Sequence, residues 1–302
     1  MRRVLITGAG GFIGRHLAPV LETAGWVVKG IGHREIGDLE SDIDWRPYLR
    51  GMDAVVHLAA KVHNMDEKAV DTKLFNSYFQ SNCSATGKLA HQAESMGVRK
   101  FIFVSTIKVH GENTNVPITC DTNLNPTDPY SQSKAAAEKL LLREINTMST
   151  TIIRPPLVYG PFVKGNFLKL LRIVDSGLPL PLAKIKNTRN LIYVGNLADA
   201  IRASLNSPPG IYLPCDKETF STETLIRKLA KALNRPARLF KVPLVLLKIG
   251  GHMTGKSKII QRLVASLIVD GKIPGWEPPY NSEEGIAETV AWWQKIKESK
   301  DP

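Results

Sequence analysis

The sequence predicts a doubly wound α/β protein, in which helices cover both faces of a parallel sheet, followed by a smaller C-terminal α/β cap. Over the first half of the chain, short apolar runs rich in β-branched residues alternate with helical stretches, a pattern typical of parallel strands buried on both faces. A glycine-rich turn joins the first run to the first helical stretch. Beyond residue 154 prolines cluster and the alternation ends, which places the cap there.

The elements follow in chain order. We expect strands at residues 2–7, 26–32, 53–58, 101–105, 151–154 and 191–194. We expect helices at residues 12–24, 133–145 and 195–206. The larger domain is then expected to comprise residues 1–160 and 188–206, and the cap residues 161–187 and 207–302.

Composition excludes several classes of protein. The 302 residues are 43% hydrophobic and 23% charged, which is ordinary for a globular protein and excludes collagen, coiled coils and disordered chains. Three scattered cysteines are too few for a disulfide framework, so we expect reduced thiols and a cytoplasmic location. No apolar run approaches the ~18 residues that cross a bilayer.

The chain is strongly basic. Forty Lys and Arg residues against 28 Asp and Glu residues give a formal net charge of +12, which favours an anionic partner such as a phosphorylated small molecule, a membrane surface or nucleic acid. Nucleic acid is not expected, because basic and aromatic residues do not interleave. Residues 224–269 contain ten Lys or Arg and no Asp or Glu, so the surplus belongs to the cap.

The glycine-rich turn predicts a dinucleotide site. Gly8, Gly11 and Gly14 follow a strand and open a helix, where side chains would block the approach of a pyrophosphate. The helix N-terminus would supply unpaired N–H groups and a positive dipole to the phosphates. This strand–turn–helix context is that of a Rossmann domain.

The end of the second expected strand indicates the cofactor. His33 and Arg34 follow it, and no acid occurs before Glu35. An acid at this point would bind a ribose 2′-hydroxyl and repel a 2′-phosphate, whereas Arg34 pairs with one. The sequence therefore favours NADP(H), with NAD(H) as the alternative.

A tyrosine–lysine pair provides the candidate catalytic group. Tyr130 and Lys134 are spaced i, i+4 and share one face of the expected helix. A nearby Lys cation is expected to lower the pKa of the phenol toward neutrality. Ser105 and Thr106 lie at the end of the fourth expected strand, and a hydroxyl there can bind the reacting oxygen of the substrate.

Together these motifs resemble an extended short-chain dehydrogenase/reductase of the nucleotide-sugar epimerase/dehydratase superfamily. The resemblance covers essentially the whole chain and includes the run His57-Leu58-Ala59-Ala60 and residues 154–161. It implies that Tyr130 is the acid/base, that Lys134 orients the nicotinamide ribose and that Thr106 binds the reacting oxygen. It also implies that Asn82 is the family's structural asparagine. It also implies that related proteins often form homodimers, so a homodimer is expected here.

The turn and the resemblance together define the expected cofactor site. Its residues are Gly8, Gly11, Phe12, Ile13, Gly14, His33, Arg34, Asp38, Leu39, Leu58, Ala59, Ala60, Tyr130, Lys134 and Pro156. The resemblance likewise implies a site for the sugar nucleotide formed by Lys108, Asn166, Phe167, Leu180, Arg189 and Arg262. For these the simpler alternatives are core packing for Phe167 and solvated surface for Arg189 and Lys108.

The residues after Thr106 restrict the reaction. Sugar 4,6-dehydratases carry Asp-Glu there, whereas this chain has Ile107-Lys108, so dehydration is not expected. The resemblance favours NADPH-dependent reduction of a UDP-4-keto-6-deoxy-N-acetylhexosamine for surface polysaccharide. The alternatives are an NAD-dependent UDP-hexose or UDP-N-acetylhexosamine 4-epimerase and a non-enzymatic NADP(H) sensor. The basic cap is then expected to approach an anionic membrane or a membrane glycosyltransferase, the alternative being a solvated basic face.

One segment imitates a different function. Residues 250–257 satisfy the pattern G-x-x-x-x-G-K-S of a nucleotide-triphosphate loop. Such a loop needs a parallel sheet behind it, and too little chain remains for one. We expect this segment to be a helix and loop of the cap, and we expect no metal site, because no Cys or His pair has ligand spacing.

Overall fold

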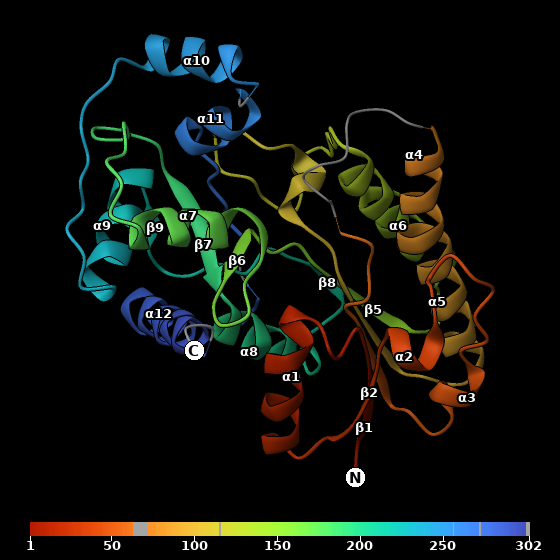
Figure 1. The fold of residues 1–302 in the computed structure, drawn as a ribbon. Coiled ribbons are helices and arrows are strands. Elements are labelled where there is room, and N and C mark those ends of the chain that lie inside the picture. Colours follow the sequence, from red (N-terminus) through yellow and green to blue (C-terminus); the bar gives the residue numbers. More distant parts are fainter. Residues whose placement is uncertain (63–71, 115, 256, 272, 300–302) are drawn as a thin grey trace.

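A computed structural model describes residues 1–62, 72–114, 116–255, 257–271 and 273–299. The larger part is a six-stranded parallel sheet in the order β2-β1-β3-β4-β5-β8 (Figure 1). Its strands are β1 (Arg3–Thr7), β2 (Val27–Ile31), β3 (Ala54–His57), β4 (Lys100–Val104), β5 (Ser149–Ile153) and β8 (Gly210–Tyr212). The chain leaves β1 first toward β2 and then returns to its other side with β3, which creates a switch point where ligands of such sheets bind.

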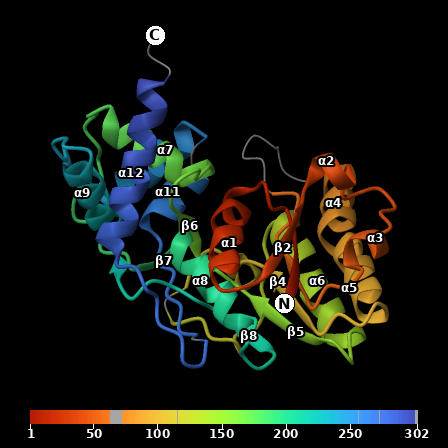
Figure 2. The same cartoon turned by 90° about the horizontal axis from the view of Figure 1, so that it is seen from below.

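Helices cover both faces of this sheet (Figure 2). Val4 and Ile6 face α1 and α8, whereas Leu5 between them packs on the opposite layer with α5 and α6, as alternation along a strand requires. The helices and helical turns of this part are α1 (Phe12–Thr23), α2 (His33–Ile36), α3 (Arg46–Leu49), α4 (Thr72–Phe79), η1 (Gln80–Ser84), α5 (Ala85–Ser95), η2 (Ile107–His110), α6 (Pro129–Glu144) and α8 (Val194–Ser204).

The cap has its own small sheet and core. Three strands pair in the order β6-β7-β9, namely β6 (Leu157–Tyr159), β7 (Arg189–Tyr193) and β9 (Thr219–Phe220). Around them lie α7 (Gly165–Asp175), α9 (Thr222–Ala232), α10 (Leu244–Met253), α11 (Ser257–Val264) and α12 (Ser282–Glu298). Phe167, Leu229 and Ile286 are among the buried residues that join these elements into one core.

The expected fold class and all six expected strands are confirmed, with three differences. The strand expected at residues 191–194 is β7, which pairs with β6 and β9 in the cap sheet, so the expected place of residues 188–206 in the larger domain does not hold for this strand. Gly210–Tyr212 pairs with β5, so the expected boundary, which put residues 207–302 in the cap, is wrong for this strand. The helix expected at residues 133–145 begins at Pro129, because Asp128 caps it through the N–H of Ser131 at 2.8 Å. Within the described residues, no helix is long and apolar enough to span a membrane.

Candidate active site

The glycine turn closes tightly against the loop after β3. Gly8 has φ +71°, and a Cβ there would lie 2.8 Å from the backbone N of Ala59, while a Cβ on Gly14 would lie 2.5 Å from the carbonyl O of Ala9. Within residues 1–62, all described, α1 has Gly11 as its N-cap, no side-chain cap and no acid in its first turn. No capping side chain or acid of its first turn therefore competes for its first N–H groups, and their contact with a pyrophosphate stays a prediction.

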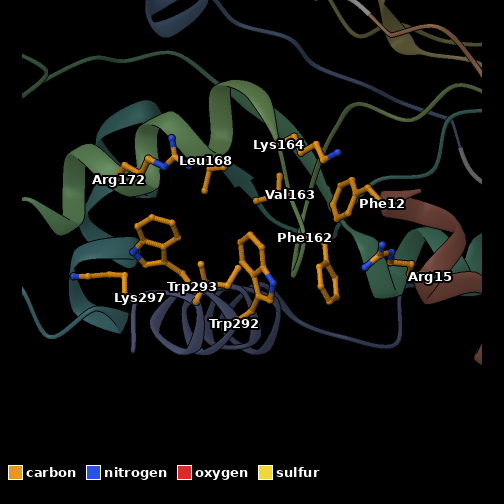
Figure 3. Close-up of a pocket in the computed structure, with 11 residues that line it drawn as sticks. Phe12, Arg15, Phe162, Val163, Lys164, Leu168, Arg172, Trp292, Trp293 and Lys297 are labelled. Atoms are coloured by element: carbon orange, nitrogen blue, oxygen red, sulfur yellow. The ribbon is translucent and has the colours of Figure 1, made fainter. Parts of the chain in front are cut away.

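Phe12 serves this site differently from the expectation. Its ring points into a pocket of about 390 Å³ between α1, α7 and α12, together with Phe162 and Trp292 (Figure 3). The ring therefore belongs to the packing between the two parts of the molecule, and only the backbone of Phe12 is available to a phosphate.

An acidic side chain, that of Glu35, lies at the end of β2. The short helix α2 turns Glu35 back, so that its Oε2 accepts the N–H of Gly32 at 2.7 Å. His33 is exposed and pairs with Asp38 at 3.0 Å, and Arg34 is exposed on the same turn. The expectation that no acid lies at this strand end is therefore wrong. The helical turn α2 returns the side chain of Glu35, three residues after Gly32, to the end of the strand.

A chain of hydrogen bonds begins at the glycine turn. Thr7 Oγ1 lies 2.6 Å from Nδ1 of His57, whose Nε2 lies 2.9 Å from Thr86 Oγ1. Thr86 donates to the carbonyl O of Asn82 at 2.8 Å, so its hydroxyl accepts from His57 and the ring is protonated on Nε2. Complete burial, assisted by Lys134, lowers the pKa of His57 to about 3, which keeps the ring neutral.

Asn82 continues this chain to the catalytic helix. It lies buried in the π-helical turn η1, a type of turn frequent at functional sites. Its amide holds both backbone groups of Lys61, at 2.8 and 3.0 Å, and donates to Ser133 Oγ at 3.0 Å. Ser133 in turn donates to the carbonyl O of Tyr130 at 2.8 Å. Asn82 is therefore a positioning residue, and the structural role implied for it fits this geometry.

Tyr130 and Lys134 share one face of α6 as predicted. The Lys134 ammonium is buried, donates to the carbonyl O of Val104 at 2.9 Å and lies 4.4 Å from the centre of the Phe103 ring. Burial lowers the pKa of Lys134 to about 7, against the opposing charge of Glu138.

The predicted lowering of the tyrosine pKa does not hold in this structure. Burial raises the pKa of Tyr130, and Asp128 and Tyr78 raise it further. Removal of water from the phenol outweighs the field of a lysine that is itself desolvated. Tyr130 is therefore a protonated phenol at neutral pH, poised to donate.

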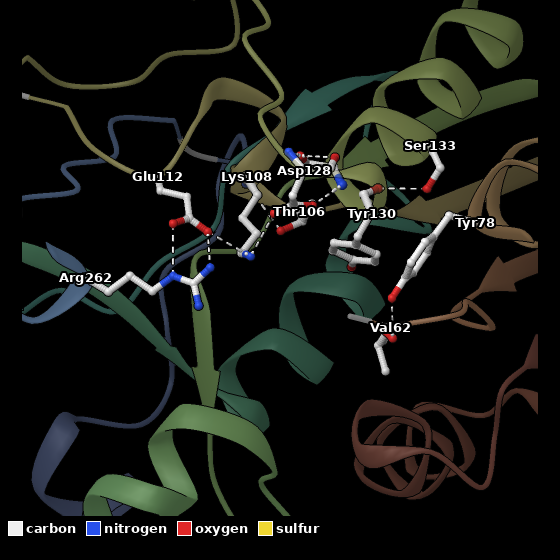
Figure 4. A network of polar contacts seen from close by, with 10 residues as sticks. Val62, Tyr78, Thr106, Lys108, Glu112, Asp128, Tyr130, Ser133 and Arg262 are labelled. Atoms are coloured by element: carbon white, nitrogen blue, oxygen red, sulfur yellow. Dashed lines mark hydrogen bonds and ion pairs between the residues drawn. The ribbon is translucent and has the colours of Figure 1, made fainter. Parts of the chain in front are cut away.

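Thr106 lies beside Tyr130 at the start of the helical turn η2 (Figure 4). Its Oγ1 accepts the N–H of Lys108 at 3.3 Å, which leaves its own O–H to donate to a substrate. The neighbouring Ser105 is buried, and its Oγ has no hydrogen-bond partner among the described residues. Only Thr106 of this pair therefore presents a hydroxyl to the site.

A buried ion pair supports α6 from behind. Arg154 contacts Glu138 through three hydrogen bonds of 2.6 to 3.2 Å and donates to Nε2 of His110 at 2.9 Å. Glu138 is the charge that opposes the loss of the Lys134 proton. His110 therefore acts as a neutral acceptor in the framework rather than as a group facing substrate, and burial lowers its pKa.

A cluster of charges lies on the cap side of Tyr130 (Figure 4). Arg262 of α11 holds Glu112 through two hydrogen bonds of 2.6 and 2.9 Å. Lys108 pairs with Glu112 at 3.1 Å and with Asp128 at 3.2 Å. Burial alone would raise the pKa of Glu112, but Arg262 and Lys108 lower it to about 2. This group of side chains, here called the ionised cluster, therefore holds Glu112 as a carboxylate at neutral pH.

Arg189 completes this cluster from behind. Its Nη1 donates to the carbonyl oxygens of Arg262 and Ala265 at 2.8 and 3.0 Å. It thereby anchors the chain that carries Arg262. Its own contact with a diphosphate stays a prediction.

The remaining predicted substrate residues divide between surface and core. Phe167 is 1% exposed and stacks on Tyr159 with ring centroids 5.4 Å apart, so its side chain packs in the core. A contact of Phe167 with the nucleotide stays a prediction. Leu180 lies half-buried against the same core. Asn166 is exposed in the first turn of α7, and its role stays a prediction.

The remaining cofactor residues lie around the switch point or at its edge. Leu58, Ala59 and Ala60 follow β3, and the N–H of Ala59 donates to Thr7 Oγ1 at 3.2 Å. Pro156 is buried after β5, whereas Leu39 packs half-buried against the α5–α6 layer.

The imitation of a nucleotide-triphosphate loop is explained by its place in the fold. Gly250 and Gly251 lie inside α10, so no strand precedes them. Lys256 lies outside the described residues. Among the described residues, no group of three or more His, Cys, Asp or Glu side chains is placed to hold a metal ion.

Two functional contributors were not assigned from the sequence. Thr86 connects His57 to Asn82, and the four-residue spacing of Asn82 and Thr86 on one helical face is the signal that could have found it. Glu112 follows the Thr106 segment by six residues, and only folding shows that it faces Arg262.

Comparison with known proteins agrees with this geometry. The profile of the NAD dependent epimerase/dehydratase family matches residues 4–213. A UDP-glucose 4-epimerase from Vibrio cholerae is 37% identical over 312 residues, which cover 96% of this chain and 94% of that protein. An N-acetyl-alpha-D-glucosaminyl-diphospho-ditrans,octacis-undecaprenol 4-epimerase from Escherichia coli O157:H7 is 28% identical over 96% of this chain and 94% of its own length.

The fold is also shared with solved structures. The crystal structure of a UDP-glucuronic acid 4-epimerase from Bacillus cereus in complex with NAD superposes with a TM-score of 0.77 at 21% identity, covering 97% of this chain and 99% of that one. The family profile covers more than half of the chain, and its residues form the parallel sheet, the glycine turn and the tyrosine–lysine pair. The chain belongs to the NAD dependent epimerase/dehydratase family, within the extended short-chain dehydrogenases/reductases.

Proposed function

We propose that this protein is an NAD-dependent 4-epimerase of a UDP-hexose or UDP-N-acetylhexosamine. The observation that carries the proposal is the position of Tyr130 beside Thr106, with the ionised cluster of Lys108, Glu112 and Arg262 on the other side of Thr106 (Figure 4). This arrangement combines a proton donor and acceptor with neighbouring cations that suit a diphosphate. The two 4-epimerases among the relatives support the choice of carbon 4.

Each residue has a role in this reaction. Thr106 donates its O–H to the oxygen on carbon 4. Tyr130 must first lose its own proton; the tyrosinate then accepts the proton of that oxygen as hydride leaves carbon 4 and gives it back as hydride returns. Lys134, with a pKa near 7, stabilises the tyrosinate while the proton is on the substrate. Arg262 and Lys108 hold the diphosphate, so that the sugar can rotate and present its other face without leaving the active site. NAD, when bound at the glycine turn, supplies the nicotinamide ring that accepts and returns hydride.

The residues after Thr106 argue against dehydration. Ile107 is 3% exposed, and Lys108 is held by two carboxylates. The nearby carboxyl of Glu112, with a pKa of about 2, is ionised and holds no proton for a departing hydroxyl. The site therefore suits removal and return of hydride without loss of water.

The cofactor is proposed to be NAD rather than NADP. Glu35 at the end of β2 suits a ribose 2′-hydroxyl and repels a 2′-phosphate, which outweighs the neighbouring Arg34. Glu35→Gln should improve the affinity for NADP relative to NAD about tenfold, measured by quenching of intrinsic fluorescence. An unchanged ratio of the two affinities would contradict this role of Glu35.

The reaction is tested with the purified enzyme and trace NAD. UDP-glucose and UDP-N-acetylglucosamine are incubated in turn, and chromatography of the sugar nucleotides should reveal the matching galacto epimer at equilibrium, with no net formation of NADH. Oxidation of NADPH by a UDP-4-keto-6-deoxy-N-acetylhexosamine, with no epimer from either sugar, would establish instead the reductase that the sequence favoured. Binding of cofactor with no turnover of any of these sugars would favour the sensor.

A further inference from the structure

Helix α10 (Leu244–Met253) has an unusual surface for a globular protein. It lies at the periphery of the cap, beyond α11 (Figure 1). Five of its large apolar side chains are exposed: Leu244 at 48%, Val245 at 66%, Leu246 at 57%, Ile249 at 50% and Met253 at 81%. Phe240, just before the helix, is 47% exposed. Such a contiguous apolar patch marks an interaction surface rather than ordinary scatter.

The helix already has a separate packing face. Leu247 is 8% exposed, and a Cβ on Gly251 would lie 2.8 Å from Ile260 of α11. At ~100° per residue, Val245, Ile249 and Met253 lie on the opposite side of the helix from Leu247 and Gly251. The outer apolar stripe is therefore not part of the cap core.

The charge around this stripe has one sign. Lys241 precedes the helix, and Lys248 and His252 lie on its flank; all three are exposed. Residues 224–269 contain no Asp or Glu in the sequence. A second copy of the same face would bring like charges together around the apolar stripe, so self-association is unfavourable. A complementary partner therefore has an anionic surface with an apolar layer beneath it.

We propose that α10 docks this protein on the surface of an anionic lipid bilayer. A helix with an apolar stripe bordered by lysines lies in the plane of the interface, with its apolar side chains among the acyl chains and its cations at the headgroups. The stripe is convex and formed by one helix, which suits a deformable lipid surface better than a preformed protein groove. The inference does not depend on the proposed reaction.

Docking at this face has a consequence for the active site. Helix α11, which packs against α10 and carries Arg262, supplies the cation that holds Glu112 in the ionised cluster. The lipid-facing helix is therefore one helix away from the sugar-nucleotide site. The enzyme would then work at the membrane surface.

The test is co-sedimentation of the full chain with vesicles of phosphatidylcholine and phosphatidylglycerol, compared with vesicles of phosphatidylcholine alone. The wild type should partition onto the anionic vesicles at low salt and leave them as salt rises. Val245→Ser with Ile249→Ser should lower the partition coefficient about tenfold, and Lys241→Gln with Lys248→Gln should do so on anionic vesicles only.

Matched controls lie on the other part of the molecule. Leu142→Ser removes an apolar side chain that is 54% exposed on α6, and Lys139→Gln with Arg143→Gln removes two exposed charges from the same helix. Both should bind vesicles as the wild type does. An unchanged midpoint of urea denaturation, relative to the wild type, reports that the α10 variants fold.

Two results would overturn the proposal. One is a wild-type protein that stays in the supernatant with anionic vesicles at low salt. That result would favour an acidic protein as the partner of the α10 surface. The other is a fall in the solution mass of Val245→Ser with Ile249→Ser from dimer to monomer in light scattering, which would make α10 an interface between copies of this chain.

Discussion

The two sides of the cleft around Tyr130 are built on different physical principles. On the cofactor side, neutral groups from Thr7 through His57, Thr86 and Asn82 to Ser133 form a buried chain of hydrogen bonds. On the cap side, charged groups form a half-exposed cluster around Glu112. Neutral buried hydrogen bonds hold atoms in place, whereas partly exposed charges respond to ligands and salt.

This difference assigns separate tasks to the two sides. The neutral chain joins the glycine turn to the helix that carries Tyr130, so it fixes the position of the acid/base relative to the cofactor site. The cluster contains cations already satisfied by Glu112 and Asp128, so an incoming diphosphate competes with these carboxylates. Changes on the first side should alter kcat and stability, and changes on the second should alter KM and its salt dependence.

The largest effect is expected at the group where the two sides meet. Tyr130→Phe removes the proton donor and should lower kcat about 1,000-fold with little change in KM, measured by the rate of epimer formation. Tyr78→Phe is the matched control, because its ring packs against Tyr130 at 6.4 Å and its hydroxyl donates to the carbonyl O of Val62. If both variants lost activity equally, proton transfer by Tyr130 would be disproved.

The next largest effect is expected from breaking the neutral chain. His57→Phe leaves Thr7 and Thr86 without their shared partner and should lower the free energy of unfolding by about 3 kcal/mol, measured by urea denaturation. His57→Gln restores one hydrogen bond and should recover part of both stability and kcat. A loss of stability in His57→Phe with kcat unchanged would show that the chain is structural and does not position Tyr130.

A smaller effect of a different kind is expected on the charged side. Arg262→Gln removes the bidentate cation and should raise KM about tenfold with kcat nearly unchanged, as fitted from initial rates. The wild-type KM should rise with salt, and the variant should lose most of that dependence. Arg227→Gln is the control, since Arg227 makes a similar but remote pair with Glu223 on α9, and a KM increase there would contradict the account.

A further effect is expected in the dependence of stability on acidic pH. Unfolded His57 gains a proton as pH falls through 6.5, whereas the folded group gains it only near pH 3, so stability falls with pH across this window. His57→Gln should reduce the slope by at most about 1.4 kcal/mol per pH unit between pH 6 and 4, measured by urea denaturation. An unchanged slope would mean that His57 is not held neutral by burial.

Local motifs predicted the framework, and folding determined the details that periodicity cannot show. The glycine turn and the spacing of Tyr130 and Lys134 specify local backbone geometry, and both stand where the sequence placed them. Glu35 could not be assigned to the end of β2 from the sequence, because only the helical turn α2 brings its carboxylate back to Gly32. The direction of Phe12 and the burial of Phe167 depend on α12 and the cap core, which are formed by distant segments.

Other differences arise from long-range competition. Gly210–Tyr212 is a short strand whose partner, β5, is more than 50 residues earlier, so its sheet could not be assigned from its own residues. The pKa of Tyr130 follows from the loss of water around the ring rather than from its spacing to Lys134. The exposed stripe of α10 resembles a core helix in the sequence, and only the fold shows that its outer face is uncovered.

The central claim is that hydride leaves and returns to carbon 4 while the sugar stays in one cleft. The most direct measurement is incubation of UDP-glucose deuterated at carbon 4 with the enzyme and substoichiometric NAD, followed by NMR of the epimer. The account predicts many turnovers of galacto product that retain deuterium at carbon 4. Loss of the label to solvent, or product limited to one turnover for each NAD added, would contradict it.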